Sequence, residues 1–490
     1  MPAVADAGQA WCLVIDQGGH STRALVFDTR GHLQASAALP IKTLTGAAGF
    51  IEQDPAEILA SVTAVLEQIA ARLGDQCSVI KKAGLIVQRS SLLAWDRHSG
   101  AAISPVLSWQ DTRHAAWLQQ HIAGSENRLQ QLTGLRANAH YGASKIRWLL
   151  DNDPCVQQYS RDALCIGPLS AFLQQRLTQS PVPCVDAVIA SRTLLTETGK
   201  ALWSDTLLDF FAIPRELLPA VRYTTDNYCD ITVGDKRIPL RLQGGDQSFI
   251  AFAQGKAFFD DSIFINAGTG AFVHRAMCSE QVPAGLLSTP LLVNHACAEH
   301  AAIANVMVAE GTVNAAATAL DWLWERRRKK LSEMELESAL QQPDAVPFFI
   351  NTVTATGSPD WLPASSPVFS FAADLASEAV AVIESVVFAL QRNISLLQAA
   401  RPAIRIVLSG GLSRLQGFCQ RLADISMLPV VCSDDSEASA RGAAYCLQDA
   451  PAEWQGLPSR TFYPQKHHGL HARYLDWSRA MSALVASSGK

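Results

Sequence analysis

The sequence predicts an α/β protein made of two unequal halves that share one plan. Each half opens with an apolar strand, a glycine-rich polar turn and a return strand. Strands and amphipathic helices alternate after each opening hairpin, as is typical of α/β domains. The chain has 490 residues, which is enough for two large domains, each with its own core.

The apolar and polar patterns predict the elements of each half. Asp54 is a typical helix N-cap and Pro55 suits the first helical position. In the first half we expect strands at 11–15, 24–27 and 83–87 and helices over 55–73 and 145–150. In the second half we expect strands at 262–266, 271–275, 404–408 and 430–432, a helix over 375–397 and a last helix around 442–444. We place two domains at 1–244 and 245–450, followed by a C-terminal extension at 451–490.

Composition excludes several classes of protein. A hydrophobic fraction of 48% with 17% charged residues is the reverse of a disordered chain. The net charge of −5 provides no general basic field, so we expect no nucleic-acid partner. The chain has no run of 18 apolar residues and no signal-peptide pattern at its start, so we expect a cytoplasmic protein without a membrane partner. The eleven cysteines form no CxxC pair or zinc-type spacing, which indicates reduced, buried thiols.

Glycine-rich turns between strands are the candidate ligand-binding elements. One follows the first strand, at Gly18-Gly19, and another follows the strand at 262–266, at Gly268-Thr269-Gly270. Such turns let backbone N–H groups approach an anion closely, and two facing turns would hold a polyphosphate. Gly410-Gly411 follows a third strand, where it would let a ring or phosphate approach the next helix. The chain has no P-loop motif, no protein-kinase H-R-D and D-F-G pair, no HExxH and no GxSxG.

In this order, the motifs resemble those of the FGGY carbohydrate kinases, most closely the glycerol kinase branch. The resemblance runs from Trp11 to about Tyr445. Its motifs are the Asp16-Gln17-Gly18 loop with Arg23, the Gly49–Pro55 run, the Lys145–Asn152 run, Gly245-Asp246-Gln247, Gly268-Thr269-Gly270, Gly410-Gly411 and Gly442-Ala443-Ala444. The resemblance implies two ribonuclease-H-like domains of the actin and hexokinase type, with ATP, Mg²⁺ and a small polyol or sugar meeting in a central cleft.

The resemblance also implies a role for each matching residue. Asp246 would be the general base that accepts the proton of the attacking hydroxyl. Asp16 and Asp246 would hold the metal, directly or through water. Arg23 would donate hydrogen bonds from its guanidinium to phosphate oxygens. The implied ATP and phosphate residues are Asp16, Gly18, Gly19, His20, Arg23, Gly268, Thr269, Gly270, Gly410 and Gly411. The implied acceptor residues are Arg89, Ser90, Trp109, His140, Asp246, Gln247 and Phe272.

Three positions depart from the family pattern. The glycerol kinase branch usually reads Q-R-E-T where this chain has Gln88-Arg89-Ser90-Ser91, so an acid that would grip hydroxyls is missing. His140 stands where a phenol is expected, next to Tyr141. Gly19 and His20 stand where the first loop is usually rich in Thr and Ser. Gly19 therefore lacks a hydroxyl that could bind phosphate.

These departures leave three functional hypotheses. The first is an ATP-dependent kinase of glycerol or a longer polyol, favoured by Gly49–Pro55 and Gln88-Arg89. The second is a ketose kinase of the xylulose or ribulose type, favoured by the smaller Ser90 and by His140. The third is a non-catalytic sugar sensor, favoured by Gly19-His20 and opposed by the intact Asp16 and Asp246. The oligomeric state stays open, with a homo-oligomer compatible with the sequence.

Overall fold

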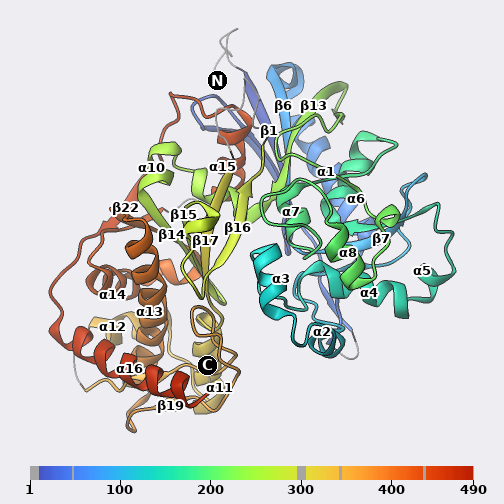
Figure 1. The fold of residues 1–490 in the computed structure, drawn as a ribbon. Coiled ribbons are helices and arrows are strands. Elements are labelled where there is room, and N and C mark those ends of the chain that lie inside the picture. The colour runs from blue at the N-terminus through green and yellow to red at the C-terminus, as the bar shows by residue number, and fades with distance from the viewer. Residues whose placement is uncertain (1–9, 47–48, 295–304, 342–344, 434–436, 489–490) are drawn as a thin grey trace. The chain divides into compact units, whose positions relative to one another are not determined.

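The protein folds into two compact units, each built from separate stretches of the chain. The structure is a computed structural model that describes residues 10–46, 49–294, 305–341, 345–433 and 437–488. Unit 1 comprises Met1–Phe258, Thr289–Met307 and Ser436–Gly456, and unit 2 comprises Phe259–Ser288, Val308–Asp435 and Leu457–Lys490 (Figure 1). These units are defined by contacts, and the domain limits 1–244, 245–450 and 451–490 stay a prediction.

A six-stranded sheet forms the centre of unit 1, in the order β12-β13-β6-β1-β2-β3. Its strands are β1 Trp11–Gln17, β2 Ser21–Phe27, β3 Leu33–Pro40, β6 Ile80–Val87, β12 Asp230–Val233 and β13 Lys236–Gly245. β2 runs antiparallel to both β1 and β3, whereas β1, β6 and β13 run parallel to one another. The carboxyl ends of three parallel strands therefore lie at one edge of this sheet, which is where open α/β sheets bind ligands.

Unit 2 repeats this strand order. The seven-stranded sheet to which it contributes has the order β16-β17-β15-β14-β20-β21-β22, with most of β16 assigned to unit 1. The strands are β14 Ser262–Ala267, β15 Ala271–Ala276, β16 Leu287–Leu292, β17 Val306–Val313, β20 Arg405–Ser409, β21 Val430–Ser433 and β22 Ser459–Phe462. β15 is antiparallel to β14 and β17, and β14, β20 and β21 are parallel. The series β17-β15-β14-β20-β21 thus matches β3-β2-β1-β6-β13, and the predicted ribonuclease-H-like fold class is confirmed.

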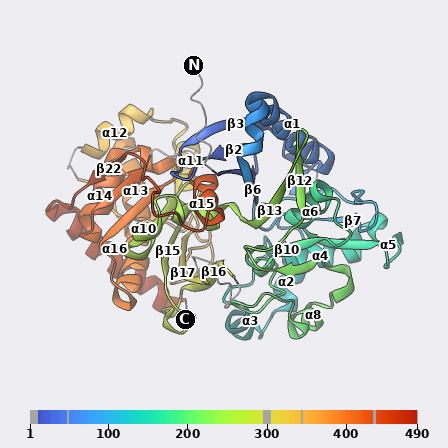
Figure 2. The same ribbon diagram turned by 90° about the horizontal axis from the view of Figure 1, so that it is seen from above.

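Helices and smaller sheets complete unit 1. Helix α1 (Pro55–Leu73) begins as predicted, because the Asp54 side chain accepts a hydrogen bond from the Ala56 N–H, and it packs on β2 and β3 (Figure 2). The other helices are α2 Ala115–His121, α3 Glu126–Thr133, α4 Gly142–Asn152, α5 Pro154–Gln158, α6 Leu169–Thr178, α7 Ala187–Ser191, α8 Asp205–Phe211, α9 Asp246–Phe249 and α15 Ala438–Leu447. Sequence patterns did not reveal the sheet of β4 Leu44–Thr45, β5 Ile51–Gln53, β7 Leu92–Asp96, β8 Val106–Leu107 and β9 Leu164–Pro168, or the pair β10 Cys184–Asp186 and β11 Ala220–Arg222.

A long apolar helix, α13 (Leu375–Ala400), forms the core of unit 2. It packs against α14 (Gln416–Ser426) and α16 (His468–Ser487), as Figure 1 shows. Among the described residues it alone is long and apolar enough to cross a membrane, but 72% of its most apolar window is buried, as in a soluble core helix. The remaining elements are α10 Lys256–Asp261, α11 Ala317–Arg327, α12 Glu333–Gln341, β18 Phe349–Ile350 and β19 Val368–Phe369.

The one acid in the middle of α13 is held by two arginines. Glu384 is fully buried, and it accepts hydrogen bonds from the guanidinium groups of Arg421 on α14 and Arg473 on α16. A buried carboxylate needs such partners because burial removes its hydration. The same contacts fix the C-terminal helix α16 to the centre of unit 2.

Helix α15 belongs to unit 1 and packs on β1 and β6. A Cβ atom at Gly442 would lie 1.8 Å from the Phe249 carbonyl oxygen, so only glycine allows this approach. The buried Arg441 donates hydrogen bonds to the carbonyl oxygens of Gly31, Ala253 and Gln455. Residues from both ends of the chain therefore meet at α15.

Gly442→Ala should destabilise the protein even though alanine favours helix formation. Helix propensity alone would stabilise by about 1 kcal/mol, but the methyl group would collide with backbone and cost about 3 kcal/mol or more. We expect a net loss of about 2 kcal/mol in the free energy of unfolding, measured by urea titration. Gly469→Ala on α16 is the control: its Cβ would come no closer than 3.4 Å to Arg473, so its stability should not fall. A Gly442→Ala variant as stable as wild type would contradict the close contact between Gly442 and the Phe249 carbonyl.

Candidate active site

Two acids and an arginine meet beside the turn that joins β1 to β2. Asp16 on β1 lies directly opposite Arg23 on β2 in the antiparallel register. Arg23 donates from Nη2 to Asp16 Oδ2 at 2.7 Å and from Nη1 to Glu437 Oε2, also at 2.7 Å. Asp16 is 2% exposed, while Arg23 and Glu437 are partly exposed. The Arg23 fork, predicted to bind phosphate, is therefore engaged by carboxylates in this structure.

Asp246 joins this cluster from the end of β13. It begins helix α9 directly after the strand, and the Gln247 N–H donates to its Oδ1 at 2.7 Å. Burial raises the pKa of Asp16 to about 7, against the opposing effect of Arg23, and the charge of Asp246 adds to the rise. Burial also raises the pKa of Asp246, against the opposing charge of Arg89. The structure thus brings together Asp16, Arg23, Arg89 and Asp246 at the carboxyl ends of β1, β6 and β13.

A chain of buried amide side chains supports the loop at Gly18-Gly19, which is predicted to bind phosphate and is called the phosphate loop below. Gln17 donates to the Gly18 carbonyl at 2.8 Å, and Gln53 donates to the Gly19 carbonyl at 2.9 Å. Gln88 then donates to the side-chain oxygens of both glutamines, at 3.2 and 2.8 Å. Because C=O and N–H point in opposite directions across a trans peptide, the N–H groups of Gly19 and His20 point away from these glutamines. This orientation is the one that an anion-binding loop requires.

The same chain continues to the predicted acceptor residues. Ser91 donates to Gln88 Oε1 at 3.1 Å, and the Trp109 backbone N–H donates to Ser91 Oγ at 2.9 Å. The Trp109 side chain is 45% exposed, and its Nε1 lies 3.5 Å from where a Cβ of Gly19 would be. One hydrogen-bonded series therefore links the phosphate loop to the residues predicted to contact the acceptor.

The other predicted acceptor residues have separate settings. The Arg89 stem lies against Gly245, where an added Cβ would be 2.5 Å from Arg89 Cγ. Ser90 follows in a left-handed conformation with φ of 66°. His140 lies just before α4, with its ring 4.6 Å from that of Tyr141, and His20 is exposed. The role of His140 at the acceptor stays a prediction.

Unit 2 brings together a second set of predicted residues. Gly268-Thr269-Gly270 follows β14, and Gly410-Gly411 follows the adjacent parallel strand β20. Gly410 has φ of 94°, and a Cβ there would lie 2.5 Å from the Ala267 carbonyl, whereas a Cβ at Gly411 would meet nothing within 4 Å. The Gly268 and Thr269 carbonyls accept hydrogen bonds from N–H groups at the start of α11. Phe272 lies on β15, 42% exposed.

The acids of the set in unit 1 fit a divalent cation. Mg²⁺ is usually bound by one or two carboxylates together with phosphate oxygens and waters, which suits Asp16 and Asp246. No group of three or more His, Cys, Asp or Glu suited to holding a metal occurs among the described residues, so these residues do not form an all-protein cage. The open backbone at Gly411 and the glycine turn after β14 leave room for a phosphate or nucleoside to approach.

Sequence reasoning missed several residues of this site. Glu437 pairs with Arg23 from 414 positions along the chain, and its only sequence signal was its place just before the Gly442 motif. Gln53 and Gln88 lay inside recognised motifs, but nothing in those motifs indicated that they bond to each other. The metal and catalytic roles of Asp16 and Asp246 stay predictions, although the structure places the two acids together.

Comparisons with known proteins agree with this architecture. The model of the N-terminal domain of the FGGY family of carbohydrate kinases matches residues 11–253, and that of the C-terminal domain matches 263–448. A glycerol kinase of Leptothrix cholodnii is 30% identical, over 98% of this chain and 100% of its own length. The crystal structure of Plasmodium falciparum glycerol kinase with ADP superposes with a TM-score of 0.85 at 21% identity, over 97% and 98% of the two chains. A xylulose kinase from Rhodospirillum rubrum superposes with a TM-score of 0.82 at 18% identity, over 98% and 100%.

Gln88→Leu should loosen the phosphate loop and the acceptor loop together. Leucine would leave the side-chain oxygens of Gln17 and Gln53 without their Gln88 donor, at a cost of about 1–3 kcal/mol. We expect faster amide hydrogen exchange in peptides covering 17–21 and 88–91, read by mass spectrometry. Peptides from α13 in unit 2 serve as the internal control. Unchanged exchange at 17–21 would show that the glutamine chain does not hold the loop.

Proposed function

Because the chain belongs to the FGGY family of carbohydrate kinases, we propose that this kinase transfers the γ-phosphate of ATP to a hydroxyl of a small, glycerol-like polyol. The observation that carries the proposal is the position of Asp16 at the end of β1 and of Asp246 directly after β13, where the charge of Asp246 raises the pKa of Asp16 and the charge of Arg89 acts on Asp246. Domains at 1–244 and 245–450, with an extension at 451–490, and a cytoplasmic location are part of the proposal.

Asp246 acts as the general base in this mechanism. Its pKa is raised by burial, which makes the carboxylate a better proton acceptor than an exposed aspartate. The acceptor hydroxyl gives its proton to Asp246 while its oxygen attacks the γ-phosphorus in line, and the bond to ADP breaks. Phosphoryl transfer depends mainly on positioning and charge neutralisation, so a modest base is sufficient.

The phosphates are bound by elements from both predicted domains. The N–H groups of Gly19 and His20 and the Gly268-Thr269-Gly270 turn hold the phosphate oxygens, and Gly410-Gly411 accommodates the nucleoside. Asp16 and Asp246 would hold Mg²⁺, directly or through water, and the bound ion would supply the positive charge that the transferred phosphoryl group needs. Arg23 keeps Asp16 in place through its 2.7 Å ion pair.

On the acceptor side, Arg89 and Gln247 bind hydroxyl groups, while Trp109 and Phe272 cover the carbon chain. Ser90 stands where the glycerol kinase branch has an acid. Glycerol would therefore bind here with one charged partner fewer. The smaller side chain leaves room for a longer polyol, and it favours a ketose as the second candidate acceptor. His140 borders the acceptor in either case.

Replacing the proposed base tests its role, and a panel of acceptors tests which substrate is used. Asp246→Asn keeps the shape of the side chain but removes the proton acceptor, so turnover should fall about 10²- to 10⁴-fold while ATP binding is retained. ADP release is measured over a panel of glycerol, longer polyols and ketoses, and ATP binding by calorimetry. Asp209→Asn, an exposed acid on α8, is the matched control.

The rates of ADP release over this panel distinguish the three functional hypotheses. Highest kcat/KM with a ketose would replace the polyol proposal by the ketose one. ATP binding without turnover on any acceptor would favour the sugar sensor and overturn the kinase proposal. An Asp246→Asn variant with wild-type turnover would remove Asp246 from the base role.

Gly19→Ser should improve the use of ATP. A Cβ at this position would lie 3.5 Å from Trp109 Nε1, an ordinary contact, so the serine fits. Its hydroxyl can add a hydrogen bond to phosphate worth about 0.5–1.5 kcal/mol, which corresponds to roughly a threefold to tenfold rise in kcat/KM for ATP. Gly19→Ala, which adds the carbon without the hydroxyl, should show no such rise. Equal effects of the two substitutions would mean that the hydroxyl plays no part.

A further inference from the structure

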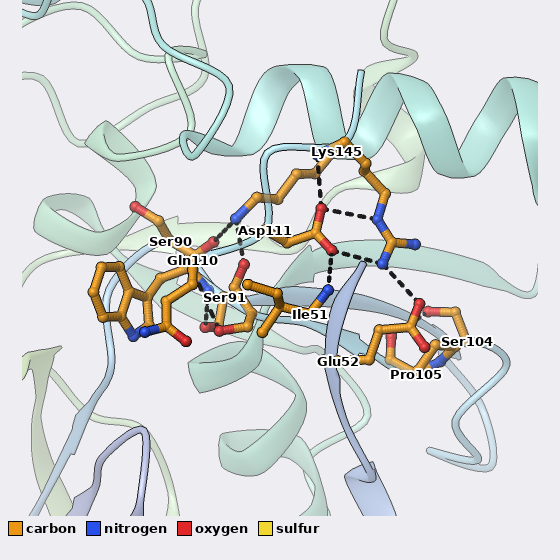
Figure 3. Close-up of polar contacts among 12 residues, drawn as sticks. Ile51, Glu52, Ser90, Ser91, Ser104, Pro105, Gln110, Asp111 and Lys145 are labelled. Carbon is orange, nitrogen blue, oxygen red and sulfur yellow. Dashed lines mark hydrogen bonds and ion pairs between the residues drawn. The ribbon is translucent and has the colours of Figure 1, made fainter. Parts of the chain in front are cut away.

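Two sequence motifs that have no role in the proposed chemistry meet in one cluster of unit 1. They are the Gly49–Pro55 run, which contains β5, and the Lys145–Asn152 run, which lies on α4. Figure 3 shows side chains of both runs converging on the segments around Ser90 and Asp111. The cluster contacts Ser90 and Ser108, the neighbours in sequence of Arg89 and Trp109.

Lys145 is the centre of this cluster. Its side chain is fully buried, and its Nζ donates to the Ser108 carbonyl at 2.6 Å and the Ser90 carbonyl at 3.1 Å (Figure 3). Ser90 directly follows Arg89, and Ser108 directly precedes Trp109. One side chain therefore holds the backbone of both proposed acceptor loops.

The bond to Ser90 is made at a strained position. Ser90 has φ of 66°, a conformation that costs free energy in residues other than glycine. Such a conformation persists only when surrounding contacts enforce it, and the hydrogen bond from Lys145 is one of these contacts. The direction in which Arg89 leaves the strand β6 depends on this turn.

A second layer of charged residues supports the same segments. Asp111 is fully buried and accepts hydrogen bonds from the Ile51 N–H at 2.8 Å and from Arg113. Arg113 also bonds to Glu52 at 2.7 Å. Its guanidinium carbon lies over the rings of both Phe50 and Trp148, 4.0 and 4.5 Å from their centres. Both motifs therefore supply parts of a single support.

The electrostatic cost at Lys145 argues against a role in packing alone. Burial lowers the pKa of Lys145 to about 7, although the charge of Asp111 acts in the opposite direction and that of Arg113 adds to the fall. An apolar side chain would fill the same space without this desolvation. Both protonation states of the amine carry at least two N–H donors, so the two carbonyls are bonded on either side of neutral pH.

We propose that Lys145 is a positioning residue for the acceptor, which sets the directions of Arg89 and Trp109 by holding the Ser90 and Ser108 carbonyls. The proposal rests on the proposed function, because Arg89 and Trp109 are its acceptor contacts. It assigns to Lys145 a larger effect on acceptor binding than on ATP binding, since neither carbonyl belongs to the phosphate loop.

Lys145→Met is the test, because methionine fills the space without donating to either carbonyl. We expect the KM for the acceptor to rise at least tenfold while the KM for ATP changes less than threefold. Lys145→Gln, which keeps an N–H donor on a shorter side chain, should lie between wild type and Lys145→Met. Gln174→Leu is the control for a buried polar loss, since Gln174 is buried on α6 and bonds to the backbone at Cys184 and Tyr228.

The outcomes separate a failure of this inference from a failure of the proposed function. Equal rises in both KM values, or the same acceptor effect in Gln174→Leu, would overturn the positioning role. Amide hydrogen exchange of peptides covering 89–92 and 107–110 gives a second readout that needs no turnover. Faster exchange in Lys145→Met or Lys145→Gln than in Gln174→Leu supports the role even if no acceptor is phosphorylated, and unchanged exchange there overturns it.

Discussion

Burial of a carboxylate beside other acids is the constraint on which the site of unit 1 depends. Burial raises the pKa of Asp16 most, Arg23 acts against that rise, and the charges of Asp246 and Glu437 add to it. Arg23 is shared by Asp16 and Glu437, and Arg89 acts on Asp246, so the three carboxylates outnumber the two guanidinium groups, which suits a site for a divalent cation. The supports of the phosphate loop are correspondingly neutral: Gln17, Gln53 and Gln88 are amides, which fix backbone carbonyls without changing this balance.

Much of the fold was predictable from the sequence, because the hairpins and glycine turns that open each half are local features. The return strand after Gly18-Gly19 and the one after Gly268-Thr269-Gly270 both lie where the apolar runs indicated. Pairings over long distances were not predictable. Nothing near Arg23 indicates a partner 414 positions later, and nothing near Lys145 indicates that its acceptors are main-chain carbonyls. Hydrophobic periodicity reports which face of an element is buried, but it does not say which polar groups meet there.

The contacts that hold the proposed acceptor loop bear on how its specificity could change. Ser91 and the Ser90 carbonyl are fixed by Gln88 and Lys145, and these contacts do not involve the Ser90 side chain. A different side chain at position 90 would therefore meet the acceptor from the same backbone position. Departures from the family pattern can accumulate at such a position without disturbing the carboxylates at Asp16 and Asp246.

The contacts of Arg441 have a consequence for synthesis of the chain. Its guanidinium joins the turn at Gly31 to Ala253 and to Gln455, and its helix α15 packs on the first strand. These groups come together only after the ribosome has made nearly the whole chain. Until then, the apolar surface of β1 that α15 covers is exposed on the nascent protein. The amino-terminal unit is thus the first to be translated but cannot complete its fold before the segment at 436–456 emerges.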